Sequence, residues 1–143
     1  MESLQLLLAK LALALISVSF AQTATYAILP PEKPTAAQIF AGNHILERAC
    51  SCESWGDPNM VPRQFNSDGS LLWGHDPVTG KPIERDLGAC QINTEVWASK
   101  AIQLGVNLYT LDGNVQFAKY LYDQYGMKPW SASASCWQQK QPN

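Results

Sequence analysis

Residues 45–54 have the sequence ILERACSCES, and the spacing of the apolar residues predicts a helix. Ile45, Ala49 and Cys52 recur at intervals of four and three, and a second apolar stripe beside them ends at Glu53. Two adjacent stripes indicate a helix in the protein core. A carboxyl group at the end of an apolar stripe is costly to ionise, so it keeps its proton at neutral pH, as a general acid must. The alternative is a solvated glutamate, although the helix dipole disfavours an acid at that end.

Helical periodicity is lost after this stretch and returns only near residue 93. Glycine and proline interrupt the segment between, which is typical of turns and short strands. Arg63–Asn66 and Ser70–Trp73 flank the turn Ser67-Asp68-Gly69 and predict a β-hairpin, with a third strand at Ile83–Leu87. This small β-flap leads into DLGACQIN at residues 86–93.

Two further helices are predicted in the C-terminal half. Asn93 or Thr94 can cap a helix that extends through Leu104. Trp97, Ala101 and Leu104 would lie together on its buried face. Asp112 is expected to cap the next helix and Gly126 to end it. The predicted fold class is therefore α+β, mainly helical with a small antiparallel flap and a groove between the two parts.

The chain ends are expected to lie outside this domain. An apolar run followed by Ser19-Phe20-Ala21 predicts a signal peptide over residues 1–21; a membrane anchor is the alternative, but the run is short for a bilayer span. Residues 22–34 form a proline-rich leader, 35–137 the folded domain and 138–143 a frayed tail. We therefore predict a secreted, extracytoplasmic protein with no stable membrane span after processing.

Composition limits the possible partners. The chain has 143 residues, and the part that follows residues 1–21 is long enough for one small domain. The hydrophobic fraction of 46% excludes a disordered chain. The formal net charge is −2, and no basic stripe suitable for nucleic acid is present. We predict no nucleic-acid partner and no cofactor.

Four cysteines in a small exported domain indicate two disulfides. Cys50 and Cys52 would point to different faces of one helix, so each is expected to have a distant partner, Cys90 or Cys136. A zinc site is the alternative. Cys-x-Cys is not the usual zinc spacing, and no further histidine or cysteine stands near Cys90 or Cys136, so we predict no metal.

Three sequence blocks together resemble the lysozyme-like superfamily, in particular small bacterial Slt-type transglycosylases. The first is the helix ending in Cys52-Glu53-Ser54, and the second, residues 86–93, is similar to the D-x-G-x-x-Q-I-N block of animal-type lysozymes. The third runs from Asp112-Gly113-Asn114 to the closing Pro129-Trp130 and Cys136-Trp137. The order and spacing of the blocks over residues 43–137 make the match more specific than any block alone.

The resemblance implies cleavage of the bond between N-acetylmuramic acid and N-acetylglucosamine in peptidoglycan or a related β-1,4-linked amino-sugar polymer. It makes Glu53 the catalytic acid and assigns Gln91 and Asn93 to the saccharide groove. Asp86 is either a second catalytic carboxylate, as in a hydrolytic lysozyme, or a strand-end residue that binds turn amides. In the transglycosylase case Glu53 acts alone, first as acid and then as base. The family elements also imply the pairing Cys52–Cys136, which leaves Cys50–Cys90.

Aromatic rings suit sugar faces, and Trp55, Trp73 and Trp130 are the expected platforms; the alternative is that most of these rings belong to the core. The sequence also departs from the family pattern. Trp55 stands where relatives often have glycine, residues 75–82 resemble an insertion, and the Ala-Tyr-Asn segment of Slt-type enzymes is missing after Gly126. A catalytically silent saccharide-binding module and a structural disulfide domain remain alternatives.

Overall fold

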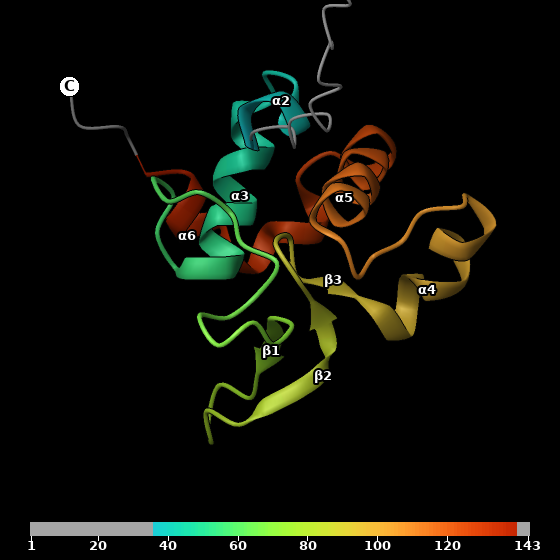
Figure 1. The fold of residues 1–143 in the computed structure, drawn as a ribbon. Coiled ribbons are helices and arrows are strands. Elements are labelled where there is room, and N and C mark those ends of the chain that lie inside the picture. Colours follow the sequence, from blue (N-terminus) through green and yellow to red (C-terminus); the bar gives the residue numbers. More distant parts are fainter. Residues whose placement is uncertain (1–35, 140–143) are drawn as a thin grey trace, which may run out of the picture. The chain divides into compact units, whose positions relative to one another are not determined.

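A computed structural model describes residues 36–139 and shows an α+β fold, which confirms the predicted class (Figure 1). The described chain forms five α-helices, one 3-10 helix and a three-stranded antiparallel sheet. The predicted signal peptide and leader lie outside the described residues. Within residues 36–139, no helix combines the length and apolar character needed to cross a bilayer.

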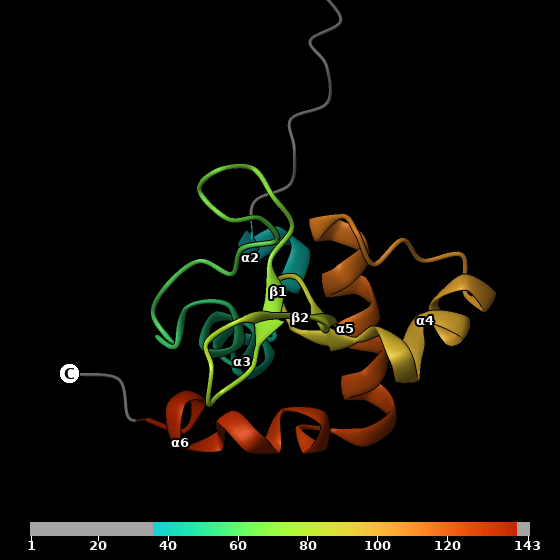
Figure 2. The same cartoon turned by 90° about the horizontal axis from the view of Figure 1, so that it is seen from below.

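The elements follow one another in the order helix, sheet, helix. The bounds are α2 Ala36–Phe40, α3 His44–Trp55, β1 Trp73–His75, β2 Pro82–Leu87, β3 Ile92–Asn93, α4 Thr94–Gln103, α5 Leu111–Tyr125, the 3-10 helix η1 Lys128–Ser133 and α6 Ala134–Trp137. Figure 1 shows the sheet projecting from one side of α2, α3 and α5, and Figure 2, viewed from that side, shows it in front of them.

The first helical region is divided in two. Ala41 and Gly42 adopt positive φ angles of 50° and 81°, which end α2. Asn43 then caps α3, its Oδ1 accepting a hydrogen bond from the Leu46 amide at 3.2 Å. Gly56 ends α3 in the left-handed conformation, with φ of 72°.

The sheet has the strand order β1-β2-β3, and Asp86 on β2 pairs with Asn93 on β3. The predicted hairpin around Ser67-Asp68-Gly69 is only partly formed, because Phe65 and Leu71 make a single bridge and regular pairing begins at Trp73. An isolated pair of short strands is marginal in water. Regular pairing in β1 therefore begins where β2 lies beside it, and β2 is itself paired with β3. The sequence pattern did not predict β3.

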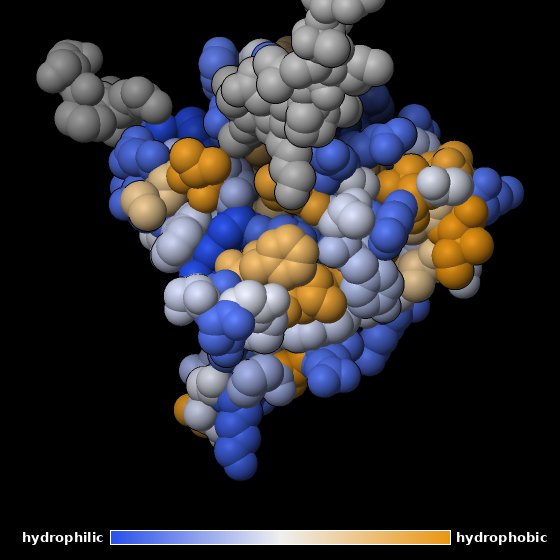
Figure 3. All heavy atoms as spheres, in the orientation of Figure 1, coloured by the Kyte–Doolittle hydropathy of each residue, from blue (hydrophilic) through white to orange (hydrophobic). Residues whose placement is uncertain are grey.

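Two expectations for the C-terminal helices are wrong. Thr110, not Asp112, caps α5, since its Oγ1 accepts a hydrogen bond from the Gly113 amide. Leu104 is 44% exposed and lies beyond the end of α4, whereas Ala101 is buried. Errors of one or two residues at helix ends are typical of boundaries assigned from sequence. Figure 3 shows the resulting apolar surface over α4.

The core is closed by α3, α5 and the C-terminal segment. Its largest fully buried side chains are Phe40, Leu46, Leu87, Phe117 and Leu121. Both disulfides are present, Cys50–Cys90 and Cys52–Cys136, the pairing that the resemblance implies. The paired cysteines are 40 and 84 residues apart in the sequence, so both disulfides join α3 to distant parts of the chain.

The predicted frayed tail is described only for its first two residues. The carbonyl oxygen of Gln139 accepts a hydrogen bond of 2.6 Å from Nη2 of Arg48, and that of Trp137 accepts one from Nε of the same guanidinium. Arg48 on α3 therefore holds the end of the described chain beside the Cys52–Cys136 disulfide.

Candidate functional site

Glu53 occupies the last turn of α3 and faces a cleft of about 420 Å³. Burial raises the pKa of Glu53 above its ordinary value of 4.5. A hydrogen bond of 2.6 Å from Oγ of Ser133 lowers the pKa, and the negative charge of Asp86 raises it. Burial is the largest of the three influences, so the carboxyl group is held toward its protonated form. This is the environment that the apolar stripe predicts.

Asp86 reaches the same cleft from the sheet. Its only described polar contact is with its neighbour Arg85, whose Nε lies 3.6 Å from Oδ2. Within residues 36–139, Asp86 accepts no hydrogen bond from a turn amide, so the strand-end alternative has no support in the geometry. Gly74 on β1 makes room for it, because a Cβ at that position would lie 3.0 Å from Cβ of Asp86.

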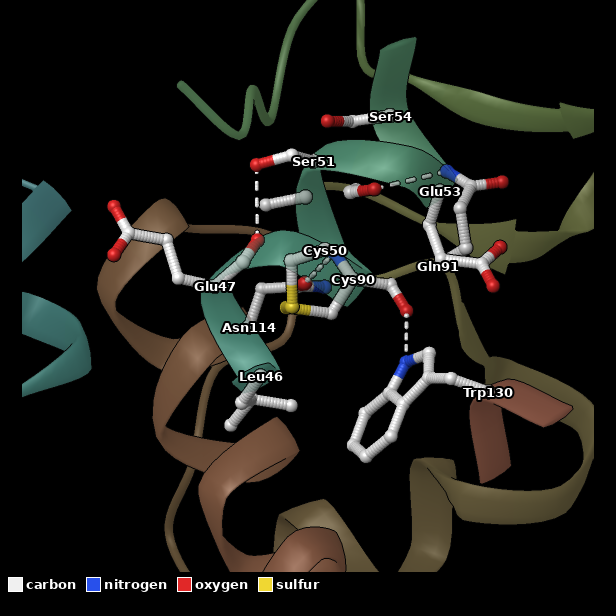
Figure 4. Close-up of a disulfide and its surroundings, with 12 residues drawn as sticks. Leu46, Glu47, Cys50, Ser51, Glu53, Ser54, Cys90, Gln91, Asn114 and Trp130 are labelled. Atoms are coloured by element: carbon white, nitrogen blue, oxygen red, sulfur yellow. Dashed lines mark hydrogen bonds between the residues drawn. A yellow bond between two sulfur atoms is a disulfide. The ribbon is translucent and has the colours of Figure 1, made fainter. Parts of the chain in front are cut away.

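Gln91 lines the same cleft as Glu53 and Asp86, and Figure 4 shows its side chain beside Glu53. Gln91 adopts a positive φ of 49°, which is uncommon for a residue with a side chain. Its Nε2 donates a hydrogen bond of 2.9 Å to the carbonyl oxygen of Gly88. The turn formed by residues 88–91 thus directs the Gln91 amide into the cleft.

Two buried amide side chains hold this turn in place. Gln64 accepts a hydrogen bond from the Ala89 amide and donates one to Leu108 O. Asn114 on α5 accepts from the Cys90 amide and donates to the carbonyl oxygens of residues 87 and 108. The Cys50–Cys90 disulfide joins the turn to α3, so its position relative to Glu53 is fixed from three directions (Figure 4).

A second cleft of about 490 Å³ adjoins the first and shares Asp86 and Gln91 with it. Asn93 lines this second cleft, but its Oδ1 caps α4 by accepting from the Val96 amide at 3.1 Å. Only the side-chain Nδ2 of Asn93 is therefore left to donate to a ligand. Adjoining clefts on both sides of one carboxylate suit an extended ligand better than a compact one.

The three predicted sugar platforms differ in exposure. Trp55 is 43% exposed and Trp73 is half-buried, and both line the cleft of Glu53. Trp73 also packs edge-on against Tyr109, with ring centroids 6.4 Å apart. Trp130 lines the second cleft but is only 3% exposed, and its Nε1 donates to Cys90 O. Its ring is therefore mainly a core element that supports the 88–91 turn.

Sequence reasoning missed four residues of this site: Ser133, Gln64, Asn114 and Arg63. Asn114 carried a signal, since it lies on the same helical face as Phe117, Ala118 and Leu121, and buried amides are normally hydrogen-bonded. Ser133 and Gln64 had none, because their partners lie 80 and 25 residues away in the sequence.

No family model, curated protein or solved structure matches this chain. In the described part of the chain, no group of three or more histidine, cysteine, aspartate or glutamate side chains is arranged to hold a metal ion. The chemistry of the cleft, together with the three sequence blocks, is therefore what indicates a function.

Proposed function

We propose that the protein cleaves the glycan strand of peptidoglycan, or of a related β-1,4-linked amino-sugar polymer, outside the cytoplasm. The observation that carries this proposal is a half-buried glutamic acid with a raised pKa in a cleft that also contains Asp86. Such a group can protonate a glycosidic oxygen at neutral pH. The two disulfides are typical of exported proteins, in keeping with an envelope substrate.

In the proposed reaction Glu53 donates its proton to the oxygen that links muramic acid C1 to the next sugar. The C1–O bond breaks, and positive charge develops at C1. In a lytic transglycosylase the C6 hydroxyl of the same muramic acid attacks C1, and ionised Glu53 takes up the hydroxyl proton. The product is a 1,6-anhydro sugar, and no water is consumed.

Hydrolysis is the second candidate, and the position of Asp86 favours it. A carboxylate in the same cleft can stabilise the charge at C1, or bond to it, before water completes the reaction. The charge of Asp86 contributes to the raised pKa of Glu53, so the two groups are close enough to interact. The alternatives differ in what attacks C1 and in whether Asp86 takes part.

The mass of the products separates the two reactions. Purified peptidoglycan is digested with the mature protein, and the soluble muropeptides are weighed by mass spectrometry. Products lighter by one water and without a reducing end identify a transglycosylase, whereas full-mass reducing products identify a hydrolase. The absence of any soluble product contradicts both and favours the saccharide-binding module.

The variant Asp86→Asn provides an independent test. As a catalytic carboxylate, Asp86 is expected to contribute at least about a hundredfold to the rate, and Asp86→Asn removes its charge with little change in shape. In a transglycosylase that uses Glu53 alone, the same variant retains most of its activity. Glu84→Gln, an exposed substitution on the same strand, is the matched control.

A further inference from the structure

Arg63 lies over the ring of Trp55 in the wall of the Glu53 cleft. Its guanidinium carbon is 3.7 Å from the centroid of the indole ring. The Nε of Arg63 donates a hydrogen bond of 3.1 Å to Ser54 O, and the indole Nε1 donates one of 2.7 Å to Val61 O. The cation and its aromatic support are therefore both held in place.

This cation has no anionic partner in the part of the chain that the structure describes. Among residues 36–139 Arg63 forms no ion pair, and neither of its Nη atoms makes a hydrogen bond. Arginine side chains carry five N–H donors in a planar fork, and toward the described residues Arg63 uses only the one on Nε.

A purely structural role explains part of this arrangement. Arg63 lies at the C-terminal end of α3, where a cation is favourable and Ser54 O needs a donor. The Nε hydrogen bond meets that need. This role does not account for the outer edge of the guanidinium, whose four Nη hydrogens are not used by it. Arg63 also lines the cleft.

We propose that Arg63 binds a carboxylate carried by the saccharide in the cleft, so that the protein prefers acidic glycan strands to neutral ones. A planar guanidinium stacked on an aromatic ring matches the two oxygens of a carboxylate. This inference rests on the proposed function. In peptidoglycan the carboxylate has two possible sources: the lactyl group of muramic acid where the stem peptide has been removed, and the stem peptide itself where it is present.

The test is equilibrium binding in the Glu53→Gln background, in which the ligand is not consumed. The probes are a tetrasaccharide of alternating N-acetylglucosamine and N-acetylmuramic acid with free lactyl carboxylates, and the neutral tetrasaccharide of N-acetylglucosamine. Arg63→Gln is expected to weaken binding of the acidic probe by about tenfold, the size of a charge-assisted hydrogen bond, and to leave the neutral probe unchanged. Lys81→Gln, which removes an exposed charge outside the cleft, should change neither.

A third probe distinguishes the two sources. It is the same acidic tetrasaccharide with an alanyl-glutamate dipeptide joined to each lactyl group, which converts the lactyl carboxylates to amides and adds peptide carboxylates. If only the affinity for the unsubstituted probe depends on Arg63, the bound carboxylate is that of the lactyl group. If the affinity for the dipeptide probe depends on Arg63, the bound carboxylate is that of the stem peptide. Either result supports carboxylate binding by Arg63.

If Arg63→Gln loses affinity equally for the acidic and the neutral probes, the proposal is overturned, because Arg63 then only maintains the shape of the cleft. Equal affinity of Arg63→Gln and its parent for all three probes overturns it as well. If Arg63→Gln does not fold, Arg63→Lys keeps the charge without the fork and should show a smaller loss, confined to acidic probes. Failure to cleave peptidoglycan would instead refute the proposed function, and the binding comparison is independent of cleavage.

Discussion

The hydroxyl oxygen of Ser133 lies 2.6 Å from Oε1 of Glu53 and 3.2 Å from Trp130 O. A hydroxyl group has one hydrogen and can also accept. It can donate to Glu53 when that residue is ionised. When Glu53 is protonated, the hydroxyl can accept from it and turn its own hydrogen to Trp130 O. Ser133 can therefore hold the same carboxyl group in place before and after proton transfer.

The variant Ser133→Ala is expected to raise the pKa of Glu53 further. The hydrogen bond from Ser133 lowers this pKa, whereas burial and the charge of Asp86, which raise it, remain in the variant. Since Glu53 must be protonated to act as the acid, the alkaline limb of the pH profile of kcat/KM should move to higher pH. Ser135→Ala, an exposed serine two residues on, should leave the limb in place. An unchanged or lowered limb in Ser133→Ala contradicts this role.

The raised pKa of Glu53 also predicts how stability depends on pH. Between the unfolded pKa, about 4.5, and the higher folded value, the native state binds more protons than the unfolded state, so the free energy of unfolding falls as pH rises. Glu53→Gln cannot ionise, so it does not show this fall in the free energy of unfolding. The variant should be more stable than the parent in urea at pH 7 and match it below about pH 4.5. Equal stability at both pH values would argue that Glu53 carries no burial penalty.

Asn114 is predicted to be essential for the 88–91 turn. Asn114→Ala leaves the Cys90 amide and Leu87 O without their side-chain partner, whereas Leu108 O keeps its hydrogen bond from Gln64. Because each buried group left unpaired costs about 1–3 kcal/mol, the variant should lose about 3 kcal/mol or more of unfolding free energy and most of its activity. Gln116→Ala, on the exposed face of the same helix, should stay within about 0.5 kcal/mol of the parent. Denaturant titration measures both, and similar values for the two variants would rule out this role.

The Cys50–Cys90 disulfide is expected to stabilise the fold and to fix the cleft. It closes a separation of 40 residues, and loss of a native disulfide from a small domain costs about 2–5 kcal/mol. The double variant Cys50→Ser/Cys90→Ser should therefore unfold at lower temperature and bind saccharide more weakly, since Gln91 adjoins Cys90. Calorimetry and a binding titration are the measurements. A variant with parental melting temperature and affinity would show that the bond is dispensable.

Local pattern was sufficient to predict much of the fold. The apolar stripes predicted α3, and Asn93, one of the two candidate caps, does cap α4. Both signals depend on residues within one or two turns of each other. The strand β3 was missed for the opposite reason: it has two residues, and it exists because β2 lies beside it.

The candidate site was predictable only where its chemistry is local. Glu53 stands at the end of an apolar stripe, so its environment could be inferred from its neighbours in sequence. The Ser133 hydroxyl and the support that Gln64 gives to the turn depend on packing between distant segments. Residues 76–81 of the insertion-like segment form the turn between β1 and β2, and its end residues 75 and 82 pair with each other in the strands. Their alternation of glycine and proline predicted a turn but not which strands it joins.

The most direct test of the central claim compares the parent protein with Glu53→Gln in the release of soluble fragments from purified peptidoglycan. The parent is predicted to release fragments, and the variant to be slower by at least about a hundredfold while remaining folded and able to bind saccharide, because only the transferable proton has been removed. A variant that releases fragments at the parental rate would contradict the assignment of Glu53 as the catalytic acid.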